Sequence, residues 1–77
     1  MILRILSVEK TIFNGPVESV ELPGTCGRFV VLERHAPLIS TLEKGEIVYQ
    51  KDGQKVRAAI AGGIAEVREN RVSVCIN

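Results

Sequence analysis

Apolar residues recur at every second position in several short stretches of this chain, a spacing typical of β-strands. The clearest alternation lies in residues 71–76, where Val72, Val74 and Ile76 are predicted to face inward. Aliphatic residues also dominate residues 2–8, which we interpret as a first strand. Almost no segment has the spacing of a helix, and the pattern therefore predicts an all-β protein.

Other short apolar runs predict further strands, each ended by turn-forming residues. In the first strand, Ile2, Leu6 and Val8 have the same parity and are predicted to share one face. Residues 29–32 form an unbroken apolar run, which is typical of a strand buried on both faces. The remaining predicted strands are residues 17–22, 38–42, 47–50, 56–60 and 64–67.

Glycine, proline, asparagine and aspartate residues mark the connections between these strands. Residues 14–16, Asn-Gly-Pro, are predicted to form a turn, and residues 24–27 a tight loop. Asp52-Gly53 lies between two strand-like runs and predicts a two-residue type I′ turn. Gly62-Gly63 either lets another backbone approach closely or marks a bulge. Pro37 keeps the residue before it out of the helical region, so the chain is predicted to turn a corner there.

The fold class that this pattern predicts is all-β, a small two-sheet β-sandwich or flattened barrel of about eight to ten short strands. A lone sheet would leave half of the aliphatic residues in water. The chain has 77 residues, of which 45% are hydrophobic, and this is enough for one core. We therefore expect a single domain over residues 1–77.

Composition and charge exclude several classes of function. The net charge is +1 and the aromatic residues are only Phe13, Phe29 and Tyr49, so we expect no nucleic-acid partner. No apolar run approaches the roughly 20 residues of a membrane-spanning helix. Cys26 and Cys75 form neither a disulfide framework nor a zinc-binding set, and we interpret them as reduced thiols of a cytosolic protein.

His35 is the only histidine, and no residue near it in the sequence completes the pattern of a nucleophilic site. A catalytic role would require Ser40 or Cys75 to approach it in space, and we interpret His35 as a loop histidine with one or two hydrogen bonds. Neither metal ligands at useful spacing nor a phosphate-binding glycine motif is present. We therefore predict no catalytic residue, no metal and no cofactor, and expect the domain to act by contact through its exposed loops.

The order and spacing of several short motifs resemble one known family. The chain is similar from end to end to the N-terminal β-sandwich domain of the epsilon subunit of F-type ATP synthase, which is called delta in mitochondria. The matching motifs are Phe13-Asn14-Gly15 with Val17-Glu18 and Val20, the loop 24–27 with the apolar run after it, His35-Ala36-Pro37-Leu38-Ile39, Lys44-Gly45, and residues 62–67 ahead of Val72-Ser73-Val74.

This resemblance implies a rotor subunit of the central stalk, which couples the gamma shaft to the membrane c-ring during proton-driven ATP synthesis and catalyses nothing itself. It implies contact with the gamma subunit and with the polar loops of the c-ring. The family's His-Ala-Pro-Leu stretch faces gamma, so the implied gamma interface is formed by His35, Ala36, Pro37, Leu38 and, less directly, Ser40. The implied location is the cytoplasmic face of a bacterial cell membrane, with peripheral attachment through the complex. The isolated chain is expected to be a monomer or to self-associate weakly.

The chain also departs from the family pattern. The implied c-ring contact falls on Arg28, where the family often has a carboxylate, so its charge is reversed. Val30 and Glu33 replace the family's usual Gly and Pro ahead of the His35 corner. The family usually continues into a helical hairpin, whereas this sequence stops at Asn77, and we expect that domain to be absent from the chain.

Two other functions remain alternatives on the residues alone. The first is a free-standing β-barrel module that binds a small ligand or nucleic acid, and the low aromatic content and near-zero charge argue against it. The second is a small enzyme that uses His35.

Overall fold

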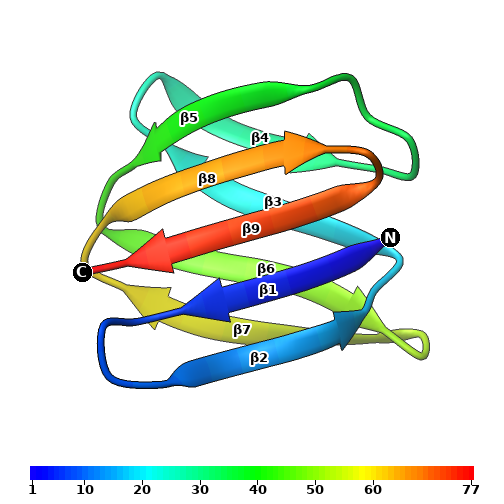
Figure 1. The fold of residues 1–77 in the computed structure, drawn as a ribbon, viewed down its shortest axis with the longest axis horizontal. Coiled ribbons are helices and arrows are strands. Elements are labelled where there is room, and N and C mark those ends of the chain that lie inside the picture. The colour runs from blue at the N-terminus through cyan, green and yellow to red at the C-terminus, as the bar shows by residue number, and fades with distance from the viewer.

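The computed structural model describes residues 1–77, which form nine strands and no helix (Figure 1). The strands are β1 (Ile2–Leu6), β2 (Thr11–Pro16), β3 (Ser19–Gly24), β4 (Gly27–Val31), β5 (Leu38–Leu42), β6 (Gly45–Lys51), β7 (Gln54–Ile60), β8 (Gly63–Arg68) and β9 (Arg71–Ile76). The predicted all-β class is therefore confirmed.

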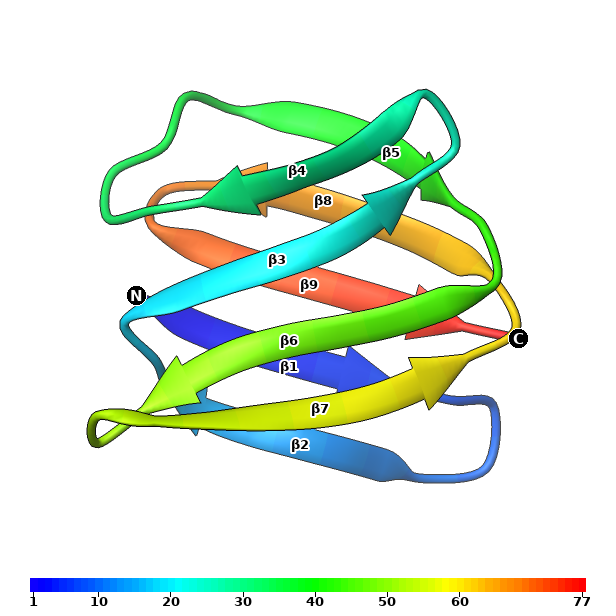
Figure 2. The same ribbon diagram turned by 180° about the vertical axis from the view of Figure 1, so that it is seen from behind.

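The strands form two layers that face one another. In the front sheet the order is β2-β1-β9-β8-β5, and all neighbours are antiparallel except the parallel pair β1 and β9 (Figure 1). In the back sheet the order is β4-β3-β6-β7, entirely antiparallel (Figure 2). The two sheets join along β5 and β3, where Gly24 pairs with Leu42, so the whole is one sheet folded over into the predicted two-layer sandwich.

The hydrophobic core lies between the two sheets and draws on almost every strand. Fourteen buried apolar residues form a single cluster. They are Leu3, Ile5, Val17, Val20, Leu22, Val31, Leu42, Ile47, Tyr49, Ile60, Ala65, Val67, Val72 and Val74. The inward alternation predicted for the last strand is confirmed at Val72 and Val74, and Ile76 is partly buried against the same cluster.

The first strand ends earlier than predicted, at Leu6 rather than at residue 8. Leu3 and Ile5 point into the core and are fully buried, whereas Ile2 is exposed and Val8 lies beyond the strand in an open loop. Both parities of this stretch carry aliphatic residues, so the alternation could not decide which face is inner. The deciding factor is the pairing of Leu3 with Val72 and of Ile5 with Val74 on β9.

Two further predictions need correction. Residues 14–16 are not a turn but the end of the edge strand β2, where Pro16 is tolerated because an edge position does not require its missing N–H. Residues 29–32 are not buried on both faces, because β4 is an edge strand that pairs only with β3. Val31 faces the core, while Val30 and Leu32 are exposed.

The two glycine-based connections behave as the sequence predicts. Asp52 and Gly53 both have positive φ angles, 52° and 76°, as a type I′ turn requires between β6 and β7. Gly63 allows a close backbone approach, because a Cβ added there would lie 2.3 Å from the carbonyl oxygen of Cys75.

Candidate functional site

The loop between β4 and β5, residues 32–37, carries the chain from the back sheet to the front sheet. We call this loop the corner. It lies at the end of the molecule that also holds residue 1 and the turn between β8 and β9 (Figure 1). Arg28 lies near the start of β4, so the strand separates it from the corner (Figure 2). The structure therefore brings the implied gamma-facing residues together at one end, with Arg28 toward the opposite end.

The backbone of the corner begins with a tight turn. The His35 amide donates a hydrogen bond to the Leu32 carbonyl oxygen at 3.1 Å, and Arg34 has a φ of 62°. A positive φ at the third residue of a turn is the type II arrangement, which favours glycine or asparagine. Arg34 is neither, so this position requires support from the surrounding structure.

The side chains of the corner differ in how far they reach solvent. His35 is partly buried, and its Nδ1 lies 2.7 Å from the Ala36 carbonyl oxygen. Ala36 and Pro37 are exposed, and Leu38 is partly buried against the core cluster. Ser40 shares the inward parity of Leu42 on β5, and its Oγ donates to the Thr41 carbonyl oxygen at 3.0 Å. Leu38 and Ser40 thus share the inward parity of β5 and are less exposed than Ala36 and Pro37.

Ile39 is an exposed apolar residue that the implied gamma interface did not include. It lies on the outer face of β5 with 74% of its surface exposed, beside a shallow groove of about 340 Å³. The groove is lined by Pro37, Leu38, Ile39, Glu66, Val67 and Arg68. Because Ile39 has the opposite parity to the core residue Leu42, its outward direction could have been inferred from the strand pattern.

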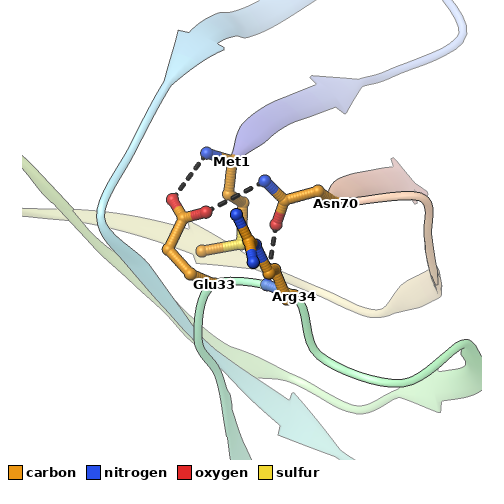
Figure 3. Close-up of polar contacts among 4 residues, drawn as sticks. All are labelled: Met1, Glu33, Arg34 and Asn70. Atoms are coloured by element: carbon orange, nitrogen blue, oxygen red, sulfur yellow. Dashed lines mark hydrogen bonds and ion pairs between the residues drawn. The ribbon is translucent and has the colours of Figure 1, made fainter.

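A polar cluster holds the corner against neighbouring segments (Figure 3). The Met1 α-amine lies 2.7 Å from Glu33 Oε1, and Asn70 Nδ2 donates to Glu33 Oε2 at 2.9 Å. The Arg34 amide donates to Asn70 Oδ1 at 2.8 Å. The hydrogen bonds from the Met1 amine and from Asn70 hold the pKa of the Glu33 carboxyl below its usual value. These partners are far apart in the sequence, so no local motif indicated them.

Arg28 is engaged with its own chain. Its Nε donates to Glu21 Oε2 at 2.6 Å, and one terminal nitrogen donates to the Glu46 carbonyl oxygen at 2.9 Å. The hydrogen bond from Arg28 lowers the pKa of the Glu21 carboxyl, and the side chains of both residues remain 42% exposed. The pair therefore offers a partner a neutralised surface rather than a lone positive charge.

The remaining candidate chemistry is not assembled around His35. Cys75 pairs with Ile64 at the start of β8, whereas the corner contacts Asn70 beyond the other end of that strand. Cys26 and Cys75 are both free and exposed. No group of three or more histidine, cysteine or acidic residues is arranged to hold a metal ion, and no helix is long and apolar enough to cross a membrane.

Comparison with known proteins gives a consistent result over the whole chain. Residues 1–77 match the family model described as "ATP synthase, Delta/Epsilon chain, beta-sandwich domain". An ATP synthase epsilon chain from Thermosynechococcus vestitus is 39% identical over 77 residues, covering 100% of this chain and 56% of the relative. One from Rhodospirillum rubrum is 46% identical over 73 residues, covering 92% of this chain and 54% of the relative. The chain thus spans about half the length of these relatives.

The fold is also found in solved structures. A chain in the Euglena gracilis mitochondrial ATP synthase structure, which comprises OSCP, F1 and the c-ring, superposes with a TM-score of 0.93 at 24% identity, covering 99% of this chain and 49% of that one. A chain from the central stalk and c-ring of the Tetrahymena thermophila mitochondrial enzyme gives a TM-score of 0.84 at 12% identity, covering 97% and 61%. At these identities the superpositions support the sandwich fold alone. The match to the family model over the whole chain and the identity to the curated relatives show that this chain belongs to the ATP synthase delta/epsilon chain family, as its β-sandwich domain.

Proposed function

We propose that this domain is a non-catalytic coupling element of the central stalk of an F-type ATP synthase. In this role it docks on the gamma subunit through the corner and approaches the polar loops of the c-ring with the region around Arg28. Membership of the delta/epsilon family supports the proposal, and so do the names of the relatives. Attachment would be peripheral, through the complex, on the cytoplasmic face of a bacterial membrane.

The observation that carries the docking proposal is the exposed apolar surface around the corner. Pro37 and Ile39 are exposed beside the 340 Å³ groove, and Glu66 and Arg68 flank it with charges of opposite sign. An apolar centre with a polar rim is the usual composition of a protein interface. We infer that an apolar side chain of gamma occupies the groove.

The contact proposed for Arg28 differs in character. Since Glu21 already neutralises the guanidinium, we infer that this surface meets the c-ring through hydrogen bonds rather than through a net charge. The family often has a carboxylate at the position of Arg28, so its charge is reversed in this chain. A contact made through hydrogen bonds does not require the c-ring loop to carry the opposite charge.

Gamma binding by substituted chains tests the proposal. We expect Pro37→Gly combined with Leu38→Asp, and separately Ile39→Asp, to weaken gamma binding at least tenfold, because a charge would be desolvated in an apolar contact. Val8→Asp is the matched control, since Val8 is 98% exposed in the loop before β2. Thermal unfolding of each variant would verify that it folds. Unchanged gamma affinity in both the Pro37→Gly, Leu38→Asp double variant and Ile39→Asp would refute the assignment of this interface.

A further inference from the structure

Asn70 connects three segments that are distant in the sequence. Its side-chain amide bonds two consecutive residues of the corner, accepting from the Arg34 amide and donating to the Glu33 carboxylate, which lie 36 and 37 residues away. Its backbone carbonyl oxygen accepts from the Ile2 amide at 3.2 Å, at the start of β1. Figure 3 shows the amide of Asn70 lying directly over the corner.

The chemistry at this position suits asparagine in particular. The side chain must present an acceptor to a backbone N–H and a donor to a carboxylate at the same time, and these two partners fix the orientation of the amide. Asn70 also has a φ of 59° in the turn between β8 and β9, a conformation that asparagine tolerates well. Aspartate supplies only acceptors when ionised, and glycine tolerates the turn but supplies no side chain.

The corner needs such support because its own bonds are few. Arg34 has an unfavourable positive φ, and Pro37 has no N–H to donate. Within residues 32–37, the backbone bond from His35 to Leu32 closes only the first turn. The two bonds from Asn70 hold the same turn from outside and tie it to the rigid pair of β8 and β9.

We propose that Asn70 is a positioning residue, which holds the corner in the conformation that docks on the partner without touching that partner itself. The docking part of this inference rests on the proposed function, whereas the support of the corner by Asn70 does not. The turn between β8 and β9 therefore belongs to the docking apparatus, although it follows the corner by more than thirty residues.

Substitutions at Asn70 test this, with amide hydrogen exchange by NMR and affinity for the purified gamma subunit of the same organism as the two measurements. Asn70→Gly keeps the turn conformation but removes both side-chain bonds, so we expect roughly tenfold faster exchange of the Arg34 amide and several-fold weaker gamma binding. Asn70→Asp places two carboxylates together and should also loosen the corner. Combining Asn70→Asp with Glu33→Gln reverses donor and acceptor across the same contact and should restore both measurements.

The outcomes separate the two parts of the inference. Unchanged Arg34 exchange in Asn70→Gly would overturn the support of the corner. Faster exchange with unchanged gamma affinity would overturn the positioning role in docking. If the Pro37→Gly, Leu38→Asp double variant and Ile39→Asp also leave gamma affinity unchanged, the proposed docking interface itself fails. The exchange result still decides whether Asn70 holds the corner. Thermal unfolding of Asn70→Gly identifies any global loss of stability, which would accelerate the exchange of core amides as well.

Discussion

Replacing Gly63 by alanine should destabilise the fold more than the same change at Gly15, the other glycine within the strands of the front sheet. Gly63 lies in β8 between Leu42 of β5 and Ile76 of β9, so it is enclosed by backbone on both sides. The new Cβ would lie 2.3 Å from the Cys75 carbonyl oxygen and 3.0 Å from Ile76 Cα. Carbon and oxygen atoms in sheets rarely approach within about 3.3 Å, so β9 would have to retreat by about 1 Å.

The displacement of β9 should lower the free energy of unfolding in two ways. Overpacking a well-packed region costs about 1 to 3 kcal/mol. Moving the end of β9 also breaks the bond from the Asn77 amide to the Gly62 carbonyl oxygen, for about 1 kcal/mol more. We expect Gly63→Ala to lower the free energy of unfolding by about 2 to 4 kcal/mol, which is a fall in Tm of roughly 10 to 30 °C for a domain of this size.

Gly15→Ala is the matched control for this experiment. Gly15 is in the edge strand β2, and the nearest atom to an added Cβ is Phe13 Cζ at 3.4 Å, an ordinary contact with a side chain. We expect a change between zero and a gain of about 1 kcal/mol, because alanine restricts the unfolded chain more than glycine does. Urea unfolding measures the free energy of unfolding of both variants, and unchanged m-values would show that the two can be compared directly. A Gly63→Ala variant within about 0.5 kcal/mol of Gly15→Ala would refute the reasoning, because differences of that size are ordinary for surface changes.

Three further predictions concern charge, packing and catalysis. The pKa of Glu33 is lower in the folded protein than its unfolded value near 4.5, so Glu33 stabilises the fold above pH 4.5. This stabilisation is lost as the pH falls through the folded pKa, and Glu33→Gln should therefore make Tm decline less steeply below pH 4.5. Ile47→Ala should lower the free energy of unfolding by about 2 to 5 kcal/mol because Ile47 is fully buried, whereas Ile64→Ala on the exposed outer face of β8 should change it by less than about 0.5 kcal/mol in urea titrations. His35→Gln should leave ATP synthesis by the reconstituted complex within about twofold of wild type. A loss of about a hundredfold or more with gamma affinity unchanged would instead indicate a catalytic acid–base group.

Alternation predicted strands well where only one parity is apolar. Val72 and Val74 alternate with polar neighbours, and the inner face of β9 followed directly from that pattern. The first strand offered aliphatic residues on both parities, and only its pairing with β9 selected Leu3 and Ile5 for the core. Strand β2 was missed because Pro16 and its polar neighbours have the composition of a turn, while pairing with β1 makes the segment a strand.

Part of the candidate site could be predicted from the sequence, and part of it is visible only in the folded structure. Residues His35 to Leu38 are contiguous, so a motif in the sequence could identify them together. Asn70 reaches Glu33 across 37 residues, and only the folded arrangement of the corner against the β8–β9 turn reveals that contact. Ile39 is an intermediate case, since its outward direction follows from strand parity but the groove beside it depends on β8.

The parallel pairing of β1 with β9 has a consequence for synthesis on the ribosome. Within this domain, β1 is made before every other strand, whereas β9, one of its two neighbours in the sheet, is made after all of them. Until residues 71–76 leave the exit tunnel, β1 and β8 each present an unpaired edge, because β9 lies between them. The nascent chain must therefore keep its β1–β2 hairpin apart from other exposed strands until residues 71–76 have left the tunnel, and only then can the front sheet close.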